Sequence, residues 1–152
     1  MELRKSIDKA LAYFLVTIMG VMVLNVLWQV FSRFLLGSPS SFTDELARYL
    51  MIWIGILGAA YVSGKNLHVA IDVLPKRFSL ATQKKLQLVV HWLVILFSLG
   101  ALVIGGSRLV YITHVLDQHS PALQVPLSLV YLVIPISGVL IIYYKISDLL
   151  KD

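Results

Sequence analysis

The side chains of this sequence that could do chemistry include most of its histidines and several of its carboxylates, and they fall into three short stretches. Such groups can bind a metal ion, move a proton or, as facing histidines, hold a haem. The stretches are Asp44 and Glu45 with Arg48; His68 with Asp72; and His114 with Asp117 and His119.

None of these stretches has the spacing of a catalytic or metal site. His114, Asp117 and His119 fit no zinc pattern, and His68 with Asp72 is best explained as a structural hydrogen-bonded pair. A haem-bearing membrane anchor of a redox complex is the alternative reading. It needs histidines at mid-depth, whereas His91, like the others, lies near an end of an apolar run. We expect no enzyme activity and no cofactor.

The composition indicates the class of protein in which these groups must be positioned. Of the 152 residues, 59% are hydrophobic and only 14% are charged, whereas soluble domains are nearer half apolar and a quarter charged. The chain also has no cysteine, which excludes disulfides, thiolate zinc sites and iron–sulfur clusters. An integral membrane protein is therefore expected.

Four apolar runs predict an all-α membrane protein with four transmembrane helices in a single domain, 1–152. The first run is too long for the core of a signal peptide, so we expect it to be a retained span. The uncharged part of the second is too short to cross a bilayer, so its helix must begin near Asp44. The predicted spans are about 10–32, 44–64, 80–107 and 126–144.

The basic residues predict the orientation of these spans. Of the 13 Lys and Arg residues, all but Arg33, Arg48 and Arg108 flank the runs on one side, which places both termini in the cytoplasm. This distribution is not that of a nucleic-acid-binding face. The cytoplasmic loop after the second span carries an apolar stripe, which predicts a short helix lying in the interface. Lys65, His68 and Asp72 share another face of that helix.

The second span has a face that is built for packing. In lipid, charged and small side chains turn toward protein partners. Arg33 ends the first span at the same depth, so we expect Arg33 or Arg48 to pair with Glu45; separate snorkelling to lipid headgroups is the alternative. The partner of the small residues is left open between the chain's own helices and another subunit. Within about 80° of the helix wheel lie Glu45, Arg48, Ile52, Gly55, Ala59 and Ser63.

Local signals mark the helix ends and a second close contact. Ser41 is the expected N-cap of the second span, and Pro126 is expected to start the fourth, which Pro135 should kink. Ala101 and Gly105 predict another close helix contact. No acidic group lies well inside a span, so the chain has too little buried polarity to carry a solute alone. These features indicate an accessory subunit.

The sequence resembles the DctQ-like small membrane subunit of tripartite ATP-independent periplasmic (TRAP) transporters. The resemblance covers nearly the whole chain and rests on two segments, VLWQVFSRFLLGSPSSFTDELARYLMIWIGILGAAYVSGKNLHVAIDVL and SPALQVPLSLVYLVIPISG. Phe42 stands where the family often has tryptophan. The matching positions are Arg33, Glu45, Arg48, His68 and Asp72, and in the last signature Pro121, Leu123, Pro126, Tyr131 and Pro135.

The resemblance implies a part in the uptake of an organic acid, such as sialic acid or a C4-dicarboxylate, across the bacterial inner membrane. In such systems a periplasmic binding protein captures the solute, and a large membrane (M) subunit moves it by symport, usually with sodium. The small subunit is then expected to be a non-catalytic brace for the large subunit, surrounded by membrane lipids, and to help dock the binding protein.

Overall fold

The computed structural model describes residues 2–38, 40–65 and 80–150. The regular secondary structure of this part of the chain is helical, and an isolated antiparallel bridge joins His119 to Pro126 in the loop before the last span. The helices are α1 (Glu2–Leu35), α2 (Ser41–Gly64), α4 (Leu80–Phe97), the π-helix η2 (Ser98–Gly105), α5 (Gly106–Val115), α6 (Leu127–Tyr131) and α7 (Val133–Leu149).

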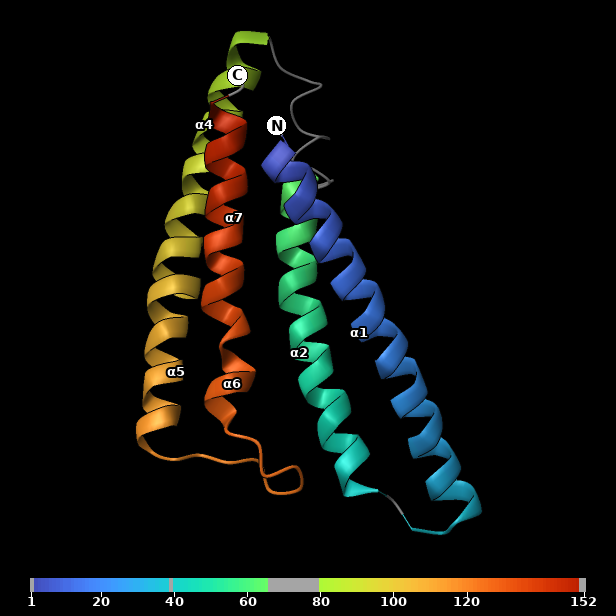
Figure 1. Ribbon diagram of the computed structural model, residues 1–152. Helices are drawn as coiled ribbons and strands as arrows, with labels where there is room; N and C mark the ends of the chain where they lie inside the picture. The colour runs from blue at the N-terminus through green and yellow to red at the C-terminus, as the bar shows by residue number, and fades with distance from the viewer. Residues whose placement is uncertain (1, 39, 66–79, 151–152) are drawn as a thin grey trace.

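Four helical stretches are long and apolar enough to cross a membrane, which confirms the predicted fold class. They are Arg4–Leu35, Ser41–Gly64, Lys85–Val115 and Leu127–Leu149. Both termini lie at the same end of these helices (Figure 1). The predicted interfacial helix, with His68 and Asp72, falls outside the described residues. The cytoplasmic location of the termini stays a prediction.

The turn between α1 and α2 is built by one glycine and one serine. Gly37 has a φ of +65°, a conformation that glycine adopts without steric cost. Ser40 is extended, and its hydroxyl accepts a 3.5 Å hydrogen bond from the backbone N–H of Thr43. Ser40 is therefore the N-cap. The prediction of Ser41 was wrong by one residue, because Ser41 already has helical geometry.

The last span is broken near its start. Pro126 immediately precedes α6, as expected, and α6 ends at Tyr131 before α7 resumes at Val133. Pro135 has no N–H to donate to the carbonyl of Tyr131 four residues earlier, so the regular helical ladder cannot continue through this turn. The break lies just before the predicted kink site, at the turn that loses its hydrogen bond.

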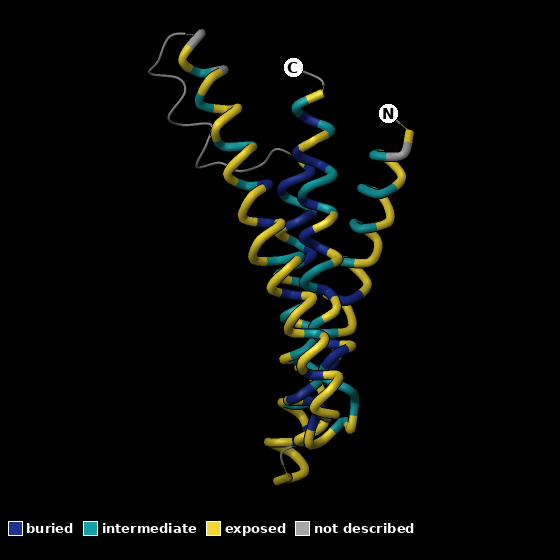
Figure 2. Tube along the Cα trace, turned by 90° about the vertical axis from the view of Figure 1, so that its left-hand side faces the viewer, coloured by how far each residue is buried: buried dark blue, intermediate teal, exposed yellow. Residues whose placement is uncertain are grey.

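The four spans form an open, twisted row. Figure 1 shows them in the order α4–α5, α6–α7, α2 and α1, and helix packing follows this order: α1 on α2, α2 on α7, and α7 on α4 and η2. In the described part of the chain, α1 and the α4–α5 span do not pack on each other to a comparable extent. Burial is accordingly concentrated where α7 meets its neighbours, and much of the surface is exposed (Figure 2).

Close contact within the row depends on glycines of the third and fourth spans. A Cβ added to Gly138 would lie 2.8 Å from Leu102 Cβ, and one added to Gly106 would lie 2.8 Å from Ile134 Cγ2. Helices approach this closely only where a side chain is missing. The residues expected to make such a contact, Ala101 and Gly105, are instead exposed in this chain.

Candidate functional site

The end of the row opposite the termini is organised around Glu45, in the first turns of α2. One carboxylate oxygen accepts hydrogen bonds from the backbone N–H groups of Ala122, at 2.9 Å, and Leu123, at 2.8 Å. The other oxygen accepts one from the Tyr49 hydroxyl at 2.9 Å. The residue is only 9% exposed. Glu45 thus ties α2 to the loop that leads into the last span.

This loop, residues 120–125, is held in one shape by its own hydrogen bonds. The N–H of Ser120 donates to the carbonyl of Val125 at 3.0 Å, and the N–H of Gln124 donates to the carbonyl of Ser120 at 3.0 Å. The Ser120 hydroxyl accepts from the N–H of Val125 at 3.3 Å. Pro121, Ala122 and Gln124 are exposed at its tip. The loop therefore presents an ordered surface at this end of the molecule.

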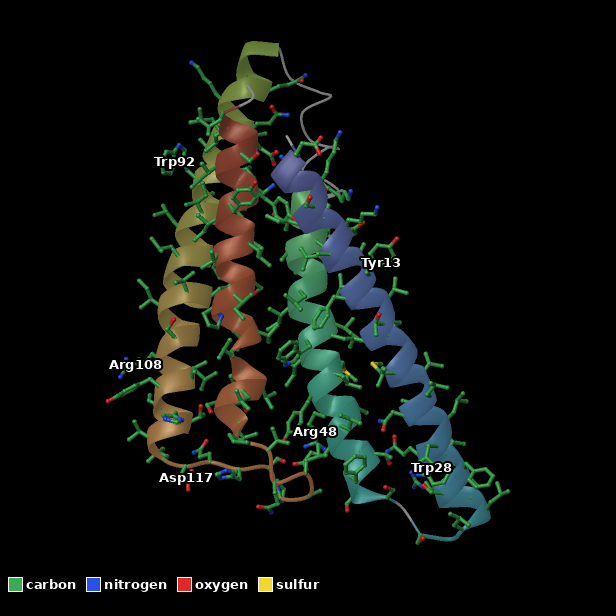
Figure 3. The ribbon with its side chains drawn as sticks, viewed as in Figure 1. Tyr13, Trp28, Arg48, Trp92, Arg108 and Asp117 are labelled. Carbon is green, nitrogen blue, oxygen red and sulfur yellow. The ribbon has the colours of Figure 1, made fainter. Side chains whose placement is uncertain are left out.

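The other charges near Glu45 do not pair with it. Arg48 forms an exposed ion pair with Asp44 at 3.2 Å, and Asp44 also accepts from the Gln29 amide at 3.1 Å. Arg33 is exposed and forms no ion pair with any described residue. The expected pairing of Glu45 with an arginine was therefore wrong, because backbone N–H groups satisfy its carboxylate. Figure 3 shows Arg48 at the same end as Trp28, Arg108 and Asp117.

The small-residue face of α2 is divided between a buried and an exposed part. Ser63 is 1% exposed, whereas Gly55 and Ala59 are exposed, and a Cβ added to Gly55 would meet no atom within 4 Å. The residues that α2 buries against the other helices of the chain include Leu57 and Ala60, but neither Gly55 nor Ala59. The chain's own helices thus leave the stripe of Arg48, Gly55 and Ala59 uncovered.

A hydrogen bond also joins the two helix pairs in the middle of the row. The indole N–H of Trp53 on α2 donates to the carbonyl of Val130 on α6 at 3.0 Å. It does so next to the helix break that Pro135 imposes. Of the signature positions, Tyr131 is half-buried at the end of α6, and Pro135 lies in the close contact with Gly106. The last-span signature is thus divided between this junction and the loop that Glu45 binds, which contains Pro121 and Leu123.

At the opposite end, Lys65 follows α2 and pairs with Asp8 of α1 at 3.2 Å. His68 and Asp72, its expected neighbours in the cytoplasmic loop, lie outside the described residues. The contact of Lys65 with Asp8 could not be predicted from the sequence, because residues 57 positions apart have no detectable spacing pattern. The same is true of Trp53 and of the loop N–H donors, although the four-residue spacing of Glu45 and Tyr49 was a usable signal.

Several polar side chains of the described residues hold helices together. The described residues contain no group of three or more histidine or acidic side chains close enough to hold a metal ion. Polar side chains inside the spans bind nearby backbone: Asn25 donates to the carbonyl of Thr43 at 2.7 Å, and Thr113 donates to that of Leu109 at 2.9 Å. These bonds join or stabilise helices.

Comparison with known proteins agrees with this geometry. Residues 22–152 match the family model described as the DctQ component of tripartite ATP-independent periplasmic transporters. A Haemophilus influenzae protein assigned as a TRAP transporter small permease is 29% identical over 99% of this chain and 91% of its own length. The sialic acid TRAP transporter small permease protein SiaQ of Vibrio cholerae is 31% identical over 70% of this chain and 61% of its own length.

A third relative is a much longer protein. The isethionate TRAP transporter permease protein DctMQ of Oleidesulfovibrio alaskensis is 27% identical over 74% of this chain, which corresponds to 18% of that longer protein. Nothing in these comparisons supports the alternative of a haem-bearing redox anchor. The chain, a multi-pass membrane protein, belongs to the DctQ family of small permease subunits of TRAP transporters.

Proposed function

We propose that this chain braces the large membrane (M) subunit of a TRAP transporter in the bacterial inner membrane. The observation that carries the proposal is the open row of helices, which leaves the α2 stripe of Arg48, Gly55 and Ala59 uncovered. Small side chains at this depth let a partner helix approach closely, and the charges at the end of the stripe are less costly beside protein than beside lipid. The relative DctMQ, of whose length the match covers only 18%, supports a larger membrane subunit as the partner.

On this proposal, the transported solute never crosses this chain. In its described spans, the buried Asn25 and Thr113 side chains bind backbone carbonyls, and no acidic relay is present at mid-depth. The large subunit then provides the path for an organic acid that a periplasmic binding protein delivers. An ion gradient drives the transport, and the resemblance to the family makes sodium the coupling ion of this proposal. The substrates in the relatives' names, sialic acid and isethionate, differ, so we extend only the class of organic acid to this chain.

We further propose that the loop at residues 120–125, held by Glu45, contributes to docking of the binding protein. Its tip is exposed and its shape is set by internal hydrogen bonds, so docking would not have to order it first. The exposed charges Arg48, Asp44 and Asp117 at the same end would set the orientation of the approaching protein.

The test is co-purification of a tagged chain with the large subunit, together with solute uptake into liposomes. We expect Gly55→Leu with Ala59→Leu to reduce recovery of the large subunit several-fold without unfolding the isolated chain, because nothing in the chain occupies that space. Gly20→Leu is the matched control, since Gly20 is exposed on α1 and also has no neighbour within 4 Å.

Uptake in this assay should require the large subunit, the binding protein and an inward sodium gradient. Solute transport by the small chain alone would contradict the proposed role as a brace. Uptake that persists when a proton gradient replaces the sodium gradient would contradict the coupling ion while leaving the brace intact.

A further inference from the structure

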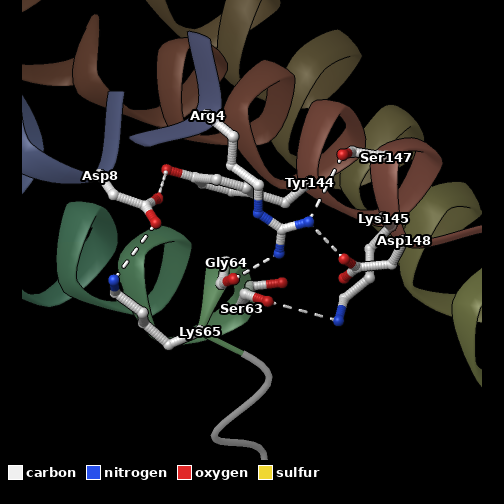
Figure 4. Close-up of polar contacts among 9 residues, drawn as sticks. All are labelled: Arg4, Asp8, Ser63, Gly64, Lys65, Tyr144, Lys145, Ser147 and Asp148. Atoms are coloured by element: carbon white, nitrogen blue, oxygen red, sulfur yellow. Dashed lines mark hydrogen bonds and ion pairs between the residues drawn. The ribbon is translucent and has the colours of Figure 1, made fainter. Parts of the chain in front are cut away.

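At the end of the molecule that carries the termini, α1, α2 and α7 meet in a cluster of charged and polar side chains that the proposed interfaces do not use. Figure 4 shows Arg4 and Asp8 projecting from α1 toward the end of α2 and toward Tyr144 and Asp148 of α7. In the described part of the chain, α1 otherwise packs along α2 alone. This cluster is therefore the place where the first span is joined to the last.

Arg4 makes contacts to both of the other helices. Its guanidinium pairs with the Asp148 carboxylate at 2.5 Å and donates to the Gly64 carbonyl at 2.6 Å. The guanidinium also lies 5.4 Å from the centre of the Tyr144 ring, within cation–π range. One side chain thus pairs with one oxygen of a buried carboxylate, binds a carbonyl at the end of α2 and covers an aromatic ring.

Asp8 makes the complementary set of contacts. It accepts a 2.7 Å hydrogen bond from the Tyr144 hydroxyl on one oxygen and pairs with Lys65 at 3.2 Å on the other. Tyr144 is completely buried. Arg4 and Asp8 are four residues apart and therefore point the same way from α1. Each of them links α1 to both α2 and α7.

Close packing leaves this cluster little freedom. A Cβ added to Gly64 would lie 2.7 Å from the Tyr144 ring, so the ring rests directly on the backbone of α2. Asp148 has one oxygen paired with Arg4, while its other oxygen is buried and has no hydrogen-bond partner among the described residues. Loss of Arg4 would leave this buried carboxylate without its ion-pair partner. Separating the two side chains therefore costs free energy, and the paired arrangement is favoured.

We propose that Arg4, Asp8, Lys65, Tyr144 and Asp148 form a clasp that fixes the angle of the first span against the rest of the row. With the clasp closed, the four spans move as one rigid body. With the clasp open, the N-terminal half of α1 can move away from α7, since α1 makes no other substantial contact with α7. The functional consequence rests on the proposed role as a brace. A small subunit with a fixed helix arrangement can hold the large subunit in place, whereas one whose first span moves cannot.

The clasp can be tested on the isolated chain in lipid nanodiscs. Because the sequence has no cysteine, spin labels can be placed at Lys9→Cys on α1 and Leu88→Cys on α4, both exposed. In the otherwise unchanged chain, we expect double electron–electron resonance to give a narrow distribution of distances between the two spin labels. Tyr144→Phe, which keeps the ring but loses the bond to Asp8, and Asp148→Asn should broaden it and extend it to longer distances.

Tyr143→Phe is the matched control, because it removes a hydroxyl that makes none of the clasp's polar contacts and keeps the ring that packs on Tyr144. It should leave the distribution narrow. Size-exclusion profiles and helical circular dichroism show whether each variant is folded. If Tyr144→Phe and Asp148→Asn are folded and still give the narrow distribution, the clasp does not set the angle of α1.

The second arm uses the complex with the large subunit. We expect Tyr144→Phe to co-purify normally but to lower the uptake rate several-fold, whereas Tyr143→Phe changes neither. Normal uptake despite a broadened distance distribution would overturn the link between clasp and transport. If the unchanged chain does not bind a large subunit at all, the proposed function fails, while the distance measurements still decide whether the clasp exists.

Discussion

Glu45 is a buried carboxylate that is satisfied by neutral donors rather than by a cation. Backbone N–H groups of Ala122 and Leu123 converge on one of its oxygens, and the Tyr49 hydroxyl satisfies the other. This solution needs no second charge near the hydrocarbon, where an isolated charge is costly. It also makes the position of the loop depend on a single side chain.

Replacing Glu45 should therefore destabilise the protein more than replacing an apolar neighbour. We expect Glu45→Ala to cost about 1–3 kcal/mol, because it leaves loop N–H groups without a partner. Leu50→Ala should cost less, since Leu50 is only half-buried and lipid can replace part of its contacts. Thermal unfolding of the purified chain compares the two. Equal shifts would mean that Glu45 does not hold the loop.

The same substitution has a local signature. Hydrogen exchange at the amides of Ala122 and Leu123 should become faster in Glu45→Ala, because these amides lose their acceptor. Exchange at Gln118 and Ser120 should change less, since their N–H groups donate to the backbone carbonyls of Thr113 and Val125 and not to Glu45. Unchanged exchange at Ala122 and Leu123 would contradict the assigned hydrogen bonds.

At the scale of elements, the third and fourth spans contact each other through missing side chains. Gly138 of α7 lies directly against Leu102 and Val103 of η2, and Gly106 lies against Ile134. Helices in lipid gain little from the hydrophobic effect, so close van der Waals contact contributes much of their association. The two glycines thus set the distance between these spans.

Adding one methyl group at this contact should separate the helices. Gly138→Ala places a Cβ 2.8 Å from Leu102 Cβ and 3.2 Å from the backbone N of Val103, so we expect a loss of about 1–3 kcal/mol from overpacking. Gly100→Ala is the control, because a Cβ there meets nothing within 4 Å. Chemical unfolding in detergent measures both, and a Gly138→Ala protein as stable as the control would show that the contact can relax.

The link between Trp53 and Val130 belongs to the same scale. Trp53→Phe keeps an aromatic ring but removes the 3.0 Å hydrogen bond to the carbonyl beside the helix break. We expect a loss of roughly 0.5–1.5 kcal/mol, in line with other hydrogen bonds between membrane helices. Trp92→Phe, on the exposed face of α4, is the control in the same unfolding assay.

The whole molecule is a row of helices that buries little of itself. Its helix pairs are joined by Glu45 at one end, by Trp53 in the middle and by the clasp at the other end. A row with two broad exposed faces suits a subunit that lies against a larger one. The orientation of the row in the membrane decides whether the Glu45 end or the clasp end faces the periplasm.

This orientation can be measured with single cysteines, because the natural chain has none. We expect Gln118→Cys to react with a membrane-impermeant maleimide in intact cells, and Lys5→Cys to react only after the membrane is permeabilised. The reason is the excess of basic residues at the end that carries the termini. The reverse labelling pattern would place the termini outside.

The sequence alone determined that the chain has four membrane-spanning helices, because length and hydrophobicity of a run decide whether it can cross a bilayer. It also marked Glu45, Pro126 and Pro135 as special, since charges near lipid and proline in a helix have strong local effects. These inferences need no knowledge of distant neighbours.

Only the tertiary structure decided which groups meet. Glu45 binds backbone N–H groups, which every sequence position but proline offers alike and which therefore leave no pattern to read. The clasp joins Arg4 to Asp148 and Asp8 to Tyr144, and these contacts depend on the angle at which whole helices pack. That angle results from many side chains at once, so no local stretch of sequence contains it.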